Sequence, residues 1–116
     1  MIVDDEQPFH DLYTKMLEGS DYRMVNVYDG YEALSKLEDK RPDLIITDLT
    51  LNMMTGDTLF LHLKSMSEYE NIPFIMATDI SHHPYKYLKR IDPDLVFLNK
   101  NFTREKLMEE VKAKIG

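Results

Sequence analysis

Short apolar runs alternate with helix-like segments along this chain, and several of the runs lead directly into a polar or charged side chain. Four runs do so: 1–3 before Asp4, 44–47 before Asp48, 74–77 before Thr78, and 95–98 one residue before Lys100. This alternation is typical of parallel βα units. Ligands bind such sheets in the crevice outside the carboxyl ends of the strands. We therefore expect these polar side chains to share one site.

The same reading predicts five strands and five helices. The strands are expected at 1–4, 22–28, 43–47, 72–77 and 95–98. The helices are expected at 8–18, after Asp29, at 57–66, from Pro84 to about Ile91, and after Thr103. Asp29 and Thr103 have side chains that favour the N-cap position. Tyr87, Leu88 and Ile91 are expected to face inward. Right-handed crossovers would place helices on both faces of the sheet.

Length and composition favour a single domain over residues 1–116, because no repeat or linker-like segment divides the chain. The absence of cysteine excludes a disulfide framework, and the net charge of −7 argues against a nucleic-acid or anionic-membrane binder. No apolar stretch approaches the ~18 residues of a membrane span. The run Met1-Ile2-Val3 is short for a strand, so we expect the first strand to be clipped at its N-terminus.

Adjacent carboxylates at the end of the first run indicate a hard, oxygen-rich site. Asp4 and Asp5 leave a strand where the chain turns, so both can reach one crevice, and Mg²⁺ prefers such ligands. The alternative is that the acids simply favour the N-terminus of the following helix. Asp48 follows a strand that we expect to be central. It could be a nucleophile toward a phosphoryl donor, a metal ligand or a turn residue.

Thr78 and Lys100 would complete a phosphoryl-binding site. An ammonium offsets the charge of a bound phosphate, and a hydroxyl can donate to a phosphoryl oxygen. Each residue also has an ordinary explanation, since Thr is common in strands and Lys is common in exposed loops.

Taken together, these motifs resemble the receiver domain of bacterial two-component response regulators over essentially the whole chain. The matching pieces are Val3-Asp4-Asp5-Glu6, the Asp48 loop ending in Gly56, the run from Pro73 to Thr78, and Lys100 followed by Asn101-Phe102-Thr103. The spacings of 43 residues from Asp5 to Asp48, 30 to Thr78 and 22 to Lys100 match the family. The resemblance implies a flavodoxin-like (βα)5 fold, a doubly wound parallel sheet with strand order 2-1-3-4-5.

The resemblance also implies roles for individual residues. Asp48 would accept a phosphoryl group, and Mg²⁺ would be bound by Asp4, Asp5, Asp48 and the backbone carbonyl of Thr50. Lys100 would contact the acyl phosphate. Thr78 would turn toward it, and Phe97 would change its rotamer. The domain would not be an enzyme apart from the Mg²⁺-dependent phosphorylation and dephosphorylation of its own Asp48.

The implied partner is a sensor histidine kinase or phosphotransfer protein in a bacterial cytoplasm. Phosphorylation would alter the face made by the segment near 84–91, the strand at 95–98 and the last helix. That face would contact a downstream effector, which the sequence does not identify. Dimerisation through it stays an open option, and direct nucleic-acid or membrane binding is not expected.

Several positions depart from the family pattern. Asn101 stands where proline, preceded by a cis bond, is usual, so either this bond is trans or the fold tolerates the cost of about 2.5–4 kcal/mol. Asp79 stands where a small residue is preferred, and it could repel a phosphoryl group, bind a cation or point to solvent. Asn52 and Thr55 change the loop after Asp48. The pair His82-His83 lacks a third metal ligand, so we expect a solvated or pH-sensitive pair.

Two other functions are weighed against the switch. The departures at Asp79 and Asn101 motivate a pseudo-receiver, a constitutive protein-interaction module of the same fold. The acids alone would also suit a small Mg²⁺-dependent phosphatase or phosphotransferase. Such an enzyme normally needs a substrate pocket or cap, for which 116 residues leave little room.

Overall fold

The computed structural model describes residues 1–81 and 83–116. Its centre is a five-stranded parallel sheet with the order β2-β1-β3-β4-β5. The strands are β1 (Ile2–Val3), β2 (Asn26–Val27), β3 (Ile45–Thr47), β4 (Phe74–Thr78) and β5 (Val96–Asn99). The helices are α1 (Gln7–Met16), α2 (Gly30–Asp39), α3 (Gly56–Lys64), the 3-10 helix η1 (His83–Arg90) and α4 (Arg104–Ile115). The predicted fold class and strand order are confirmed.

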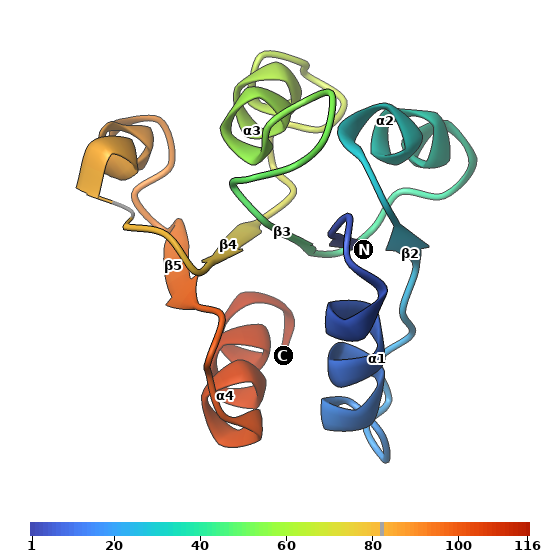
Figure 1. Ribbon diagram of the computed structural model, residues 1–116. Coiled ribbons are helices and arrows are strands. Elements are labelled where there is room, and N and C mark those ends of the chain that lie inside the picture. Colours follow the sequence, from blue (N-terminus) through green and yellow to red (C-terminus); the bar gives the residue numbers. More distant parts are fainter. Residues whose placement is uncertain (82) are drawn as a thin grey trace.

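Helices cover both faces of the sheet, as the crossover rule predicts. Figure 1 shows α2, α3 and η1 on one side and α1 and α4 on the other. The strands divide their side chains between two cores because neighbouring strand residues point to opposite faces. Ile45 and Phe74 belong to the core under α2 and α3. Ile46 and Ile75, one residue further along each strand, belong to the core over α1 and α4.

Two predicted helix starts are confirmed by their capping bonds. The Asp29 carboxylate accepts the N–H of Glu32 at 2.8 Å at the start of α2. The Thr103 hydroxyl accepts the N–H of Lys106 at 3.1 Å at the start of α4. Each bond satisfies one of the orphan donors that a first helical turn leaves.

The second strand is shorter than the predicted 22–28. Parallel pairing joins only Ile2 to Asn26 and Val3 to Val27. The ladder begins with the Ile2 N–H, which donates to the carbonyl of Val25 at 2.8 Å.

The segment predicted as the fourth helix is a 3-10 helix, and two of its inward assignments are wrong. Leu88 is fully buried, but Tyr87 is 45% and Ile91 is 48% exposed. A 3-10 helix turns about 120° per residue, so the neighbour of a buried residue points well away from the core. Pro93 disfavours a helical Asp92, which limits the segment and leaves Ile91 beyond its end. His82 lies outside the described residues, so the expectation for the histidine pair stays a prediction.

Within the described residues, no helix has the length and apolar character needed to cross a membrane.

Candidate functional site

The four polar groups expected at the sheet edge do lie at the carboxyl ends of their strands. Asp4 follows β1, Asp48 follows β3, Thr78 ends β4, and Lys100 follows β5. The N–H of Asp48 donates to the carbonyl of Val3 at 3.1 Å, which extends the ladder between β1 and β3 to the site. The sheet therefore delivers these residues to one place although they are far apart in sequence.

A buried lysine joins the two central carboxylates. Lys100 Nζ lies 2.5 Å from Asp48 Oδ2 and 2.8 Å from Asp4 Oδ2. All three residues are at most 6% exposed. Lys100 Nζ also lies 3.8 Å from Glu6 Oε2, at the exposed side of the site. One ammonium thus faces a cluster of acids, as a buried charge requires.

Burial and pairing shift the pKa values of this group in ways that bear on its chemistry. Burial raises the pKa of Asp48, and the hydrogen bonds from Lys100 and from the Thr50 N–H offset only part of that effect. Burial alone would lower the pKa of Lys100, but the bonds to Asp4 and Asp48 outweigh it and raise the pKa. Lys100 therefore stays a cation at neutral pH.

The acids at the end of β1 fit a divalent cation. Asp4, Asp5 and Glu6 each offer a carboxylate oxygen, and these oxygens lie within 4.8 Å of one another. Asp4 is buried, Asp5 is half-buried and Glu6 is exposed, so the group is open to solvent on one side. Carboxylate oxygens with room for water are the donor set that Mg²⁺ prefers.

The loop after β3 is shaped around Asp48. The N–H of Thr50 donates to Asp48 Oδ1 at 3.1 Å. A Cβ on Gly56 would lie 1.9 Å from the Asp48 backbone oxygen, so only glycine allows this approach. Met53 has a φ of 69°, the left-handed region that few side chains adopt. Asn52 is one of the two loop residues that depart from the family pattern. Its backbone carbonyl accepts the N–H of Met54 at 2.8 Å.

Thr78 joins this group through the backbone, and Phe97 lies on the neighbouring strand β5. Thr78 is 2% exposed, and its hydroxyl accepts the N–H of Ile80 at 3.3 Å. Its carbonyl accepts the N–H of Lys100 at 3.0 Å, which connects β4 to the lysine through the backbone. Phe97 is half-buried in β5, beside the core under α2 and α3.

Two of the departures from the family pattern have structural outcomes. Among the described residues no peptide bond is cis, so the bond between Lys100 and Asn101 is trans. Lys100 nevertheless reaches both carboxylates. Asp79 is exposed, in agreement with the alternative in which it points to solvent.

Two site residues were missed in the sequence. The Phe9 ring lies beneath Lys100, with Nζ 3.8 Å from the ring centroid. His10 is 1% exposed, and its Nε2 lies 2.7 Å from the backbone oxygen of Asp4. The spacing of His10, Tyr13 and Leu17 matches the buried stripe of α1, and this spacing was the available signal.

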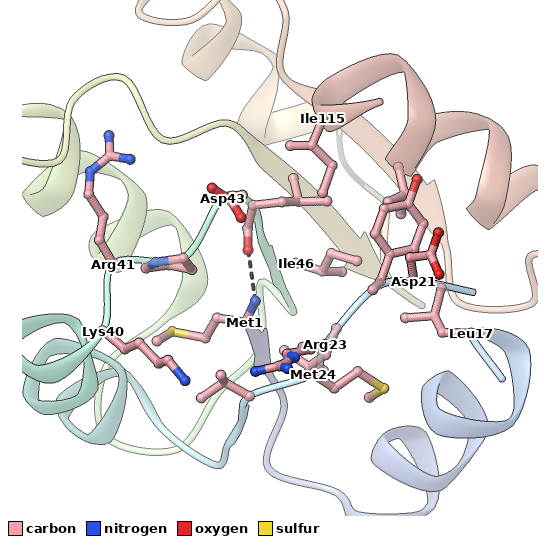
Figure 2. A pocket seen from close by; sticks show the side chains of 16 residues that line it. Met1, Leu17, Asp21, Arg23, Met24, Lys40, Arg41, Asp43, Ile46 and Ile115 are labelled. Carbon is pink, nitrogen blue, oxygen red and sulfur yellow. Dashed lines mark hydrogen bonds between the residues drawn. The ribbon is translucent and has the colours of Figure 1, made fainter. Parts of the chain in front are cut away.

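A cavity of about 370 Å³ lies at the opposite end of the sheet, where β1, β2 and β3 begin. Figure 2 shows Met1, Arg23 and Asp43 among its lining residues. It contains none of the residues that the sequence predicts for the site. The cavity therefore lies apart from the candidate site at the carboxyl ends of the strands.

The fold and the site together define an α/β domain with a cluster of acids and one buried lysine at the carboxyl ends of its strands. Comparisons with known proteins identify its family. A family model described as the response regulator receiver domain matches residues 1–112. The chain therefore belongs to the response regulator receiver domain family.

Relatives agree with this assignment. The chain is 28% identical over 116 residues to the polar-differentiation response regulator DivK of Brucella anthropi, covering 100% of this chain and 94% of DivK. It is 27% identical over 111 residues to hybrid signal transduction histidine kinase D of Dictyostelium discoideum, covering 96% of this chain but 7% of that protein. The receiver domain of a histidine kinase from Syntrophus aciditrophicus has a TM-score of 0.84 and 30% identity, with 98% and 86% covered.

Membership of the family carries general properties. Receiver domains are signalling modules of two-component systems, and a phosphorylation switch is general to them. They are generally non-enzymatic, and they typically bind Mg²⁺ through acidic residues.

Proposed function

We propose that this domain is a signalling switch in which Asp48 accepts a phosphoryl group from a phosphohistidine in a Mg²⁺-dependent reaction. The donor would be a sensor histidine kinase or a phosphotransfer protein. The observation that carries the proposal is the buried contact of Lys100 with both Asp48 and Asp4. It supports a site that binds an anion next to a cation-binding group of acids. The cytoplasmic location implied by the family resemblance stays a prediction.

Asp48 is the group that would react. A carboxylate oxygen of Asp48 attacks the phosphorus, the new P–O bond forms as the P–N bond breaks, and the partner's imidazole leaves with the bond's electrons. Phosphoryl transfer needs positioning and charge stabilisation more than covalent chemistry from the protein. Lys100 contacts two carboxylates before the reaction. Once Asp48 carries the phosphoryl group, the Lys100 ammonium would bind the phosphoryl oxygens in place of the Asp48 carboxylate.

Asp4, Asp5 and Asp48, with the carbonyl of Thr50, would hold Mg²⁺. The ion would supply neutralisation of the charge on the transferring phosphoryl oxygens. Thr78 would donate its hydroxyl to the bound phosphoryl group, which requires it to release the N–H of Ile80. That release would loosen the chain between β4 and η1, and Phe97 in β5 would change rotamer with it.

The surface expected to respond is formed by η1, β5 and α4. Large apolar side chains are exposed on and beside η1, where Ile80 is 44%, Tyr87 is 45% and Ile91 is 48% exposed. Apolar and aromatic side chains of this kind are favoured in protein interfaces. We infer that an effector binds this face, with dimerisation through the same face as the competing use.

Intact-protein mass spectrometry tests the proposal directly. The chain is incubated with acetyl phosphate or phosphoramidate and Mg²⁺, beside Asp48→Asn. We expect wild type to gain one phosphoryl group, and we expect no gain in the variant or in a chelator. A gain that persists in Asp48→Asn would place the acceptor elsewhere.

The second candidate is a pseudo-receiver that binds its partner constitutively. It is motivated by Asp79, because this exposed carboxylate follows Thr78 and would oppose an incoming phosphoryl group if it turned toward the site. Under this function wild type gains no phosphoryl group, and Asp48→Asn binds the partner as tightly as wild type does. Restoration of phosphorylation by Asp79→Ala would identify Asp79 as the cause.

A further inference from the structure

His10 is a buried histidine for which the proposed phosphoryl transfer has no direct use. It lies in α1 and is 1% exposed. Its Nε2 lies 2.7 Å from the backbone oxygen of Asp4, and its Nδ1 lies 2.7 Å from the side-chain oxygen of Asn26 in β2. One imidazole thus joins α1 to the ends of two strands. A carbonyl oxygen can only accept, so Nε2 donates in the bond to Asp4. The Asn26 amide is the partner of Nδ1, through its oxygen when Nδ1 also carries a proton and through its NH2 when Nδ1 does not.

Asp4 is held on every side, and His10 supplies one of the four contacts. The Asp4 N–H donates to the carbonyl of Val27 at 3.2 Å. Its Oδ1 accepts the N–H of Glu6 at 2.9 Å, and its Oδ2 lies 2.8 Å from Lys100 Nζ. The β1 strand ends at Val3, so the Asp4 carbonyl stands just beyond it. His10 is the hydrogen-bond donor at this carbonyl.

The imidazole is itself held firmly. Its ring packs against that of Tyr28, with centroids 4.3 Å apart and planes inclined at 40°. The Tyr28 hydroxyl donates to Gln7 Oε1 at 2.7 Å, one turn before His10 on α1. Packing against Tyr28 fixes the ring so that Nε2–H points to the Asp4 carbonyl.

We infer that His10 is a positioning residue for the carboxylate site. The direction of the Asp4 carbonyl sets the plane of the peptide between Asp4 and Asp5. That plane sets how Asp5 leaves the strand relative to Asp4. By holding the carbonyl, His10 prearranges the two carboxylates for the cation. The inference rests on the proposed function, because the group that it arranges is the proposed Mg²⁺ site.

Three substitutions separate this role from simple packing. His10→Gln keeps an N–H near the position of Nε2. His10→Asn keeps polarity near Nδ1 but is too short to reach Asp4. His10→Leu fills the space without a donor. Asn26→Ala is the matched control, because it removes the other contact of the ring and leaves the bond to Asp4. Mg²⁺ affinity is measured by calorimetry, and folding is measured by urea unfolding in a chelator.

Removal of an outer partner of a metal ligand typically lowers affinity by about 10–100-fold. We expect His10→Asn and His10→Leu to bind Mg²⁺ at least ~10-fold more weakly, and His10→Gln and Asn26→Ala to bind within ~3-fold of wild type. Equal affinities in all variants that fold, or the same loss in His10→Gln as in His10→Leu, would overturn the inference.

A measurement on wild type tests the inference even when the variants do not fold. The His10 Nε2–H resonance should exchange slowly, couple across the hydrogen bond to the Asp4 carbonyl carbon, and shift when Mg²⁺ is added. A resonance that does not respond to bound Mg²⁺ would count against positioning. Wild type that binds no Mg²⁺ overturns the proposed site and His10's role together. Wild type that binds it while every variant matches it overturns His10's role alone.

Discussion

Keeping the buried Asp48 side chain ionised lowers the stability of the folded domain. Burial raises its pKa, so the folded chain binds this proton more tightly than the unfolded chain does. The contribution of Asp48 to folding stability is therefore fully present at a pH below the ordinary pKa of Asp, and it is lost as the pH rises through the raised pKa. An ionised Asp48 destabilises the domain at neutral pH.

We accordingly expect Asp48→Asn to be more stable than wild type at neutral pH in a chelator, by on the order of 1 kcal/mol. The amide oxygen can still accept from Lys100, so the network survives. The difference should shrink as the pH falls through the raised pKa of Asp48, because the wild-type carboxyl then becomes neutral as well. Urea unfolding across this range measures it. Asp21→Asn removes an exposed carboxylate and controls for net charge. A difference that does not depend on pH would contradict the prediction.

Gly56 is the residue that steric contact fixes most tightly. In Gly56→Ala the new Cβ would meet the Asp48 backbone oxygen, and backbone cannot move aside as a side chain can. We expect a loss of about 2–4 kcal/mol in unfolding free energy. Gly30→Ala is the comparison, because its Cβ would meet side-chain atoms of Met54 at 2.7–2.9 Å and no backbone atom, so it should cost less than Gly56→Ala. Equal losses in the two variants would refute the steric explanation.

At the scale of elements, Lys64 joins α3 to the chain before β4 and to the chain before β5. Its Nζ lies 3.3 Å from Asp92 Oδ2 and donates to the carbonyls of Glu70 at 2.9 Å and Ile72 at 3.0 Å. Its side chain is 10% exposed. Lys64 thereby connects the end of α3 to the segment after η1.

We expect Lys64→Met to lower the unfolding free energy by about 1.5–3 kcal/mol, the range for hydrogen bonds to a charged group. The methionine keeps most of the apolar stem, so the loss in unfolding free energy measures the contribution of the ammonium. Lys106→Met is the control, because Lys106 pairs with Glu110 on the exposed side of α4 and should change stability little. Thermal and urea unfolding should agree. An unchanged midpoint in Lys64→Met would show that its contacts are dispensable.

At the scale of the whole molecule, the proposed Mg²⁺ site would make stability depend on the cation. A ligand that binds only the folded chain adds about 2.7 kcal/mol when its concentration is 100 times its dissociation constant. We therefore expect Mg²⁺ to raise the thermal midpoint reversibly, and a chelator to abolish the gain. Asp5→Asn should lose most of it, while Asp21→Asn should retain it. An equal gain in Asp5→Asn would remove Asp5 from the proposed ligands.

The sequence predicted the elements well where local chemistry decides them. The caps at Asp29 and Thr103 are side-chain bonds to the next turn, so residue type and spacing suffice. The 3-10 helix was predicted incorrectly as an ordinary helix facing the core through Tyr87 and Ile91. Its form depends on Pro93 and on how Leu88 meets the sheet, and packing of that kind has no local signature.

The sequence by itself determined the parallel architecture and brought Asp4, Asp48 and Lys100 to one edge, because the carboxyl ends of parallel strands must meet there. Only the tertiary structure decided that Lys100 bridges the two carboxylates across a trans bond to Asn101. Only it placed His10 on the Asp4 carbonyl. These contacts join residues from different elements. Their geometry follows from how α1 and β5 pack on the sheet, which neither periodicity nor spacing encodes.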